Sequence, residues 1–360
     1  MSPRTYLDHA ATTPIAPAAR AAMADALERW ANPSSPHREG RAARAALEEA
    51  RGRIKAALGW DHELIFTASA TEAARIALAG ARGGPPAIAS AVEHQAVLGA
   101  RPDAAIAPVE AGGRVDQARL AALLADRPGA VVAIQQVNSE TGVIQPLDAL
   151  AAMVRAAGAV LFADCAQGAG RLPLPPADLI AVSAHKLGGP PGVAALLVRD
   201  FALIEPRGPG QEQGYRPGTE NLPAILGFAA ALADDDERGW IAECARWRAA
   251  LDDVVRGGGG AVICDASPRS PLIASYRLPG MSAAAQLMRL DAVGFAVSAG
   301  SACSSGSLRP SHVLTALGID ERAAGEVIRV SFGRTTQAEE VARFAAAWQA
   351  LAGEAKARAA

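Results

Sequence analysis

Short apolar runs alternate with helix-like segments over the first 200 residues, and this alternation limits the possible folds more than any other feature. The runs are ELIFT, PAIAS, GAVVAIQQV, AVLFAD, DLIAVSA and VAALLV. They do not alternate polar with apolar residues, which is typical of parallel strands buried on both faces of a sheet. Helical patterns are predicted between them at 71–79, 93–100, 116–126 and 146–157. The pattern predicts an α/β fold with a parallel sheet.

A chain of 360 residues is about twice the usual size of one domain. A long helical stretch from about residue 221 to 255 ends in the glycine run 257–260, where we expect a boundary. Beyond it, LIASYRL, FAVSAG and EVIRVSFG resemble strands, and helices are predicted near 282–291, 312–317 and 337–352. We therefore expect a large domain over 17–255 and a smaller α+β domain formed by 1–16 and 256–360.

The composition excludes several classes of function. A net charge of −2 gives no basis for binding nucleic acid or an anionic membrane surface. No run of 18 apolar residues and no signal-like N-terminus is present, so we expect a cytoplasmic protein without a membrane partner. The four cysteines have no CxxC spacing, which argues against a zinc site and a disulfide framework, and we expect no metal.

Ligands of open parallel sheets bind at the carboxyl ends of the strands. There the sequence places Asp164, after AVLFAD, and Lys186, after DLIAVSA. A pyridoxal phosphate enzyme needs such a pair, because the lysine forms a Schiff base with the cofactor and the carboxylate keeps the pyridine nitrogen protonated. Either residue alone is more readily explained as a cap or an ion-pairing group. Thr71 and His94 lie at predicted helix starts. Each is either a helix cap or a residue that contacts the cofactor.

A single thiol, Cys303, lies in the small-residue stretch SAGSACSSGS. A structural cysteine normally has bulky apolar neighbours. Serine and glycine pack poorly and bend easily, so this stretch is typical of a mobile loop.

These signals occur together, and in the same order, in one known family. The sequence resembles the cysteine desulfurases of the NifS/IscS type, within the class V aminotransferases. The matching motifs are YLDHAATTP, NPSSPHREGRAAR, TASATEA, EHQAVL, NSETGVIQP, DCAQGAGRLP, SAHKLGGPPG, YRPGTEN, GSACSSGSLRPSHVL and IRVSFGR. The resemblance implies the aspartate-aminotransferase fold (fold type I of pyridoxal phosphate enzymes), with a mainly parallel seven-stranded sheet. It also implies a homodimer, pyridoxal 5'-phosphate as cofactor and L-cysteine as substrate.

The resemblance also implies roles for individual residues. Lys186 matches the Schiff-base lysine, Asp164 the partner of the pyridine nitrogen, and Cys303 the nucleophile that becomes a persulfide. The remaining matches are His94, stacked on the ring; Gln167, bound to the ring hydroxyl; Ala70, Thr71, Ser183 and His185, in the phosphate cradle; Thr219, added to that cradle by the neighbouring subunit; and Arg334, with Asn138 and Ser139, at the substrate.

Two positions depart from the family pattern. Ser139 stands where many members have a second asparagine that contacts substrate and cofactor, so we expect Asn138, a water or the backbone to compensate. Ser69 replaces the usual glycine before the phosphate-binding residues. Either the hydroxyl of Ser69 contacts the phosphate, or the replacement of glycine only requires a different backbone angle at this position.

Other functions remain compatible with these motifs. A selenocysteine lyase or another β-lyase on the same scaffold is one alternative, and a catalytically weak protein that binds a sulfur carrier is another. The acceptor of the sulfur, in iron–sulfur cluster assembly or a thiolation pathway, is not identified by the sequence.

Overall fold

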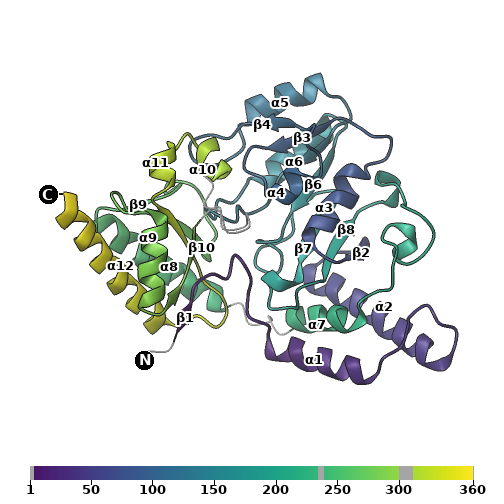
Figure 1. Ribbon diagram of the computed structural model, residues 1–360. Coiled ribbons are helices and arrows are strands. Elements are labelled where there is room, and N and C mark those ends of the chain that lie inside the picture. The colour runs from purple at the N-terminus through teal and green to yellow at the C-terminus, as the bar shows by residue number, and fades with distance from the viewer. Residues whose placement is uncertain (1–3, 234–238, 300–310, 360) are drawn as a thin grey trace.

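A seven-stranded sheet forms the centre of the larger part of the molecule (Figure 1). The computed structural model describes residues 4–233, 239–299 and 311–359. The strand order is β2-β8-β7-β6-β5-β3-β4. The strands are β2 (Glu63–Thr67), β3 (Ala87–Ser90), β4 (Ala105–Ala107), β5 (Val131–Ala133), β6 (Val160–Asp164), β7 (Leu179–Ser183) and β8 (Ala194–Val198). The prediction of a mainly parallel sheet is confirmed.

One strand differs in direction from the prediction. β8, the run VAALLV, is antiparallel to both of its neighbours, β7 and β2. The physical reason is the short connection 184–193, because a parallel crossover needs a dozen or more residues and usually a helix. β4 was not predicted, since three residues carry too little pattern.

Helices cover both faces of this sheet, which explains why its strands do not alternate in polarity. One face packs against α2 (Arg38–Leu58), α5 (Gln117–Asp126), α6 (Leu147–Ala156) and α7 (Leu222–Ala233). The other packs against α3 (Ala70–Ala79) and α4 (Gln95–Leu98). On β6, for example, Leu161 and Ala163 face the first set and Phe162 faces the second. α1 (Pro17–Glu28) packs on α7.

Within the stretch predicted to be helical from about 221 to 255, the described residues form α7 and α8 (Gly239–Gly257). α8 packs with α12 (Ala338–Ala359) in the C-terminal part of the fold. There an antiparallel sheet has the order β12-β13-β10-β9. Its strands are β9 (Ala261–Val262), β10 (Ile273–Arg277), β12 (Ser298–Ala299) and β13 (Val327–Ser331).

The remaining elements complete this second region. α9 (Ala283–Ala292), α10 (His312–Ala316) and α11 (Glu321–Ala324) lie beside the small sheet (Figure 1). β1 (Thr5–Tyr6) pairs in parallel with β11 (Phe295–Ala296), and the chain then runs toward α1 below the large sheet (Figure 1). The N-terminal segment thereby joins the two regions. The domain limits at residues 17–255 stay a prediction. No helix within the described ranges is long and apolar enough to cross a membrane.

Candidate active site

A pocket of about 270 Å³ opens at the carboxyl ends of β6 and β7, beside the first turn of α3. Such sheet ends are where open α/β folds bind their ligands. The pocket brings together most of the predicted site residues, namely Ala70, Thr71, His94, Ser139, Asp164, Gln167, Ser183, His185 and Lys186. Its wall also contains Ser69, Arg329 and the N-terminal residues Ala10 and Ala11.

Lys186 ends a single 3-10 turn (η1, Ala184–Lys186) that directly follows β7. Its Nζ donates to the carbonyl oxygens of Ala10, at 2.5 Å, and Ala11, at 2.8 Å. The carbonyl oxygen of Lys186 accepts from Thr13 Oγ1 at 3.1 Å and from the Arg171 guanidinium. The lysine amine is therefore held in the pocket from the side of the N-terminal segment.

Asp164 is the last residue of β6, and its Oδ1 accepts from the backbone amide of Ala166 at 2.9 Å. Burial raises the pKa of this carboxyl, while that hydrogen bond and the nearby His94 and Lys186 oppose the shift. A buried carboxyl of this kind gains stability from a cationic or N–H partner. The pocket thus offers a site for a protonated nitrogen.

His94 caps α4, and its Nδ1 accepts from the backbone amide of Ala96 at 3.1 Å. This bond leaves the ring proton on Nε2 when the imidazole is neutral. Burial lowers the pKa of His94, and Asp164 opposes the shift. Gln167 donates through Nε2 to the carbonyl of Ala10 at 2.8 Å, and its buried Oε1 has no partner among the described residues.

The first turn of α3 forms the end of the pocket suited to an anion. The first intrahelical bond runs from the Ala73 amide to the Ser69 carbonyl, so the amides of Ala70 and Thr71 precede the hydrogen-bond ladder. Ser69 Oγ accepts from the Glu72 amide at 3.1 Å, and its backbone is extended, with φ of −165°. The hydroxyl of Ser69 thus acts as the helix cap, and no unusual backbone angle is needed.

The profile of the class V aminotransferases matches residues 5–344. The chain belongs to the class V aminotransferase family. A cysteine desulfurase of Cereibacter sphaeroides is 36% identical over 95% of this chain and 94% of that protein. Among solved structures, a NifS-like protein from Rickettsia africae superposes with a TM-score of 0.89 at 29% identity, covering 96% of this chain and 98% of that one. A structure of SspA in complex with cysteine has a TM-score of 0.79 at 26% identity, covering 91% and 98% of the two chains. The expected fold type is confirmed.

At the substrate end of this class V aminotransferase, the pocket contains an arginine other than the predicted Arg334. Arg334 is exposed and is not among the described residues that line the pocket, whereas Arg329 on β13 lines it with a side chain only 4% exposed. The sequence also marks Arg329, because it is the only charged residue inside the apolar strand Val327–Ser331.

Asn138 is buried and does not line the pocket, while Ser139 does. The Asn138 Oδ1 accepts from the amides of Glu140, at 3.0 Å, and Thr141, at 2.8 Å, and its Nδ2 donates to the Val92 carbonyl. The hydrogen bonds of its side-chain amide thus stabilise the turn that places Ser139 at the pocket. Asn138 cannot also compensate for the shorter side chain of Ser139.

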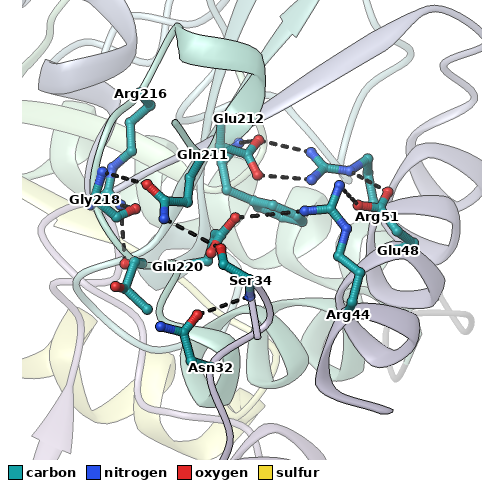
Figure 2. Close-up of polar contacts among 12 residues, drawn as sticks. Asn32, Ser34, Arg44, Glu48, Arg51, Gln211, Glu212, Arg216, Gly218 and Glu220 are labelled. Atoms are coloured by element: carbon teal, nitrogen blue, oxygen red, sulfur yellow. Dashed lines mark hydrogen bonds and ion pairs between the residues drawn. The ribbon is translucent and has the colours of Figure 1, made fainter. Parts of the chain in front are cut away.

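Thr219 is exposed and lies on the loop before α7, outside the pocket of its own chain. Figure 2 shows how this loop is held: Gln211 Oε1 accepts from the Gly218 amide at 3.1 Å, and Arg216 donates to the Gly218 and Thr219 carbonyls. Ser183 and His185 lie in the pocket, with His185 Nδ1 and Thr12 Oγ1 3.1 Å apart. Cys303 lies outside the described residues.

Proposed function

We propose that this chain is a pyridoxal-phosphate-dependent cysteine desulfurase, which converts L-cysteine to L-alanine and leaves the sulfur atom as a persulfide on Cys303. The observation that carries the proposal is the meeting of Lys186, Asp164 and the first turn of α3 in one pocket at the sheet edge. The names of the curated relatives support the choice of cysteine as substrate.

The pocket fits the cofactor at each of its polar groups. Lys186 would hold it covalently, and Asp164 would face the pyridine nitrogen. Gln167 Oε1, which has no partner in the described ranges, would accept from the ring hydroxyl. Ala70 and Thr71 would bind the phosphate at the helix N-terminus, with Ser183 and His185 beside it. When bound, pyridoxal phosphate withdraws electrons from the substrate Cα and so makes the proton on Cα removable.

The residues of the chain then have distinct tasks. The Lys186 amine is the base positioned to accept the Cα proton. The Cys303 thiolate attacks the substrate sulfur, so that an S–S bond forms while the C–S bond breaks and its electron pair stays on carbon. That carbon takes up a proton, which balances the proton lost by the Cys303 thiol. The products are L-alanine and the Cys303 persulfide.

Recognition of the substrate carboxylate falls to Arg329 in this proposal. Arg329 lines the pocket, whereas Arg334 is exposed and is not among the described residues that line it. The planar fork of arginine suits a carboxylate. The exposed Thr219 would add a hydroxyl to the phosphate site of a second copy, which makes the homodimer the active unit. A sulfur acceptor protein would then take the persulfide sulfur.

Reduction of the purified protein with borohydride tests the cofactor assignment. We expect the reduced cofactor on the peptide that contains Lys186, and we expect Lys186→Ala to fold but to retain no covalently bound cofactor. Attachment to any other lysine would refute the assignment. Sulfide release from L-cysteine in the presence of a thiol reductant tests the reaction itself.

A further inference from the structure

The segment 5–13 joins the two regions of the fold at the pocket. Leu7 donates through its amide to Ala296 and accepts from the Ser331 amide at 2.8 Å, which fixes the segment along β13. Three residues further on, the carbonyls of Ala10 and Ala11 accept from Lys186 Nζ. One short segment therefore contacts both the strand that carries Arg329 and the lysine of the active site.

Asp8 lies between these two sets of contacts and pairs with Arg329. Its Oδ1 accepts from Arg329 Nη2 at 2.8 Å, and the two side chains are 21% and 4% exposed. Arg329 Nη1 donates to the carbonyl oxygen of Ser139 at 3.0 Å. Two nitrogens of the guanidinium are thus fixed, one by the N-terminal segment and one by the turn that follows β5.

The rest of the guanidinium has capacity for a ligand. Arg329 Nε is buried and has no hydrogen-bond partner among the described residues. Nη1 and Nη2 each carry a second N–H besides the one already used. Arg329 lines the pocket, and a guanidinium whose remaining donors have no partner among the described residues can bind a carboxylate in a fixed orientation.

We propose that Asp8 is a positioning residue for substrate recognition: by holding Nη2, it fixes the Arg329 guanidinium so that the remaining donors meet the carboxylate of an α-amino acid. This inference rests on the proposed function, because it assigns Arg329 to the substrate carboxylate. It makes the opposite prediction from simple electrostatics. If Asp8 served only to reduce the charge near the ligand, its removal would tighten carboxylate binding.

The test is a comparison of Asp8→Asn with Asp103→Asn in the cofactor-loaded protein. Asp103 pairs with Arg101 at 2.8 Å on the surface, away from the pocket, and serves as the matched control. The measurement is the dissociation constant of L-alanine, followed by cofactor absorbance, beside that of ethylamine, which lacks the carboxylate. For Asp8→Asn we expect L-alanine to bind about ten- to a hundredfold more weakly, with ethylamine unchanged. The KM for L-cysteine should rise similarly, with kcat little altered.

A double-mutant cycle identifies the route of the effect. If Asp8 acts through Arg329, adding Asp8→Asn to Arg329→Met should weaken L-alanine binding no further. Additive losses, unchanged or tighter L-alanine binding in Asp8→Asn, or an equal loss for ethylamine would each overturn the proposal. Should Asp8→Asn not fold, Asp8→Glu gives the same readout, because its longer side chain displaces the guanidinium. L-alanine binding that depends on Asp8, in a protein that releases no sulfide from cysteine, would refute the proposed function and leave this inference intact.

Discussion

Replacing Arg51 by methionine tests how the loop that carries Thr219 is attached to the central sheet. Arg51 donates to Glu212 Oε2 at 2.9 Å and to Oε1 at 2.8 Å (Figure 2). The Glu212 side chain is 1% exposed, and among the described residues its only other donor is the Phe66 amide, at 2.8 Å. The substitution therefore leaves a buried carboxylate with one hydrogen bond.

The expected loss can be worked out from these contacts. Removing one partner of a buried ion pair costs about 3–5 kcal/mol, because the remaining charge stays out of water. The Arg51 guanidinium also lies over the Phe66 ring, 4.7 Å from its centroid, which contributes about 0.5–1 kcal/mol. The methionine recovers part of the apolar packing. We expect the free energy of unfolding to fall by about 4 kcal/mol.

Urea titration followed by tryptophan fluorescence measures this loss. Arg246→Met is the control, because Arg246 is 75% exposed and, within the part of the chain that the structure describes, pairs only across one turn of α8 with Glu243. Its loss should be about 0.5 kcal/mol or less. Arg51→Met combined with Glu212→Leu removes both charges and should recover much of the stability. A loss in Arg51→Met no greater than in Arg246→Met would refute the reasoning.

Two further predictions concern the turn beside the pocket. Ser139→Asn should lower the KM for L-cysteine about tenfold, because the longer amide can reach a ligand in the pocket, while the Asn138 side chain is bound within its own turn. Steady-state kinetics measure this, and an unchanged or higher KM would contradict it. Burial raises the pKa of Glu140 to about 7, while a hydrogen bond from Ser311 and the charge of Arg329 oppose the shift. The folded state thus binds a proton at Glu140 more tightly than the unfolded chain does. The protonated carboxyl contributes its full stability below about pH 4.5, and this contribution is lost as the pH rises towards 7. Glu140→Gln should remove about 2–4 kcal/mol of that pH dependence in urea titrations, and an unchanged slope between pH 5 and 7 would contradict the assignment.

The sequence predicts the sheet well because burial on both faces leaves a continuous apolar run. An apolar run has no direction, so the reversal of β8 could be recognised only from the short connection 184–193. α1 was not predicted at all, because its many alanines give little contrast between faces. Strand direction and weakly amphipathic helices depend on contacts that a local pattern does not contain.

In the site, too, some features could be predicted from the sequence and others could not. Asp164 and Lys186 could be predicted because strand ends in an α/β fold converge on one edge, whatever the packing of the rest. The orientation of Asn138 could not, since it depends on two amides of a buried turn. The presence of Arg329 in the pocket depends on which side of β13 faces the pocket. The pairing with Asp8 joins residues more than 300 positions apart.

The central claim, sulfur transfer from L-cysteine to Cys303, is tested most directly by mass spectrometry after one turnover without reductant. The peptide that contains Cys303 should gain the mass of one sulfur atom, and the peptides of Cys165, Cys244 and Cys264 should not. Burial raises the pKa of each of these three thiols, which keeps them protonated and unreactive. Cys303→Ser should still bind the cofactor and L-cysteine but release almost no sulfide. Added sulfur on another cysteine, or full desulfuration by the serine variant, would contradict the account.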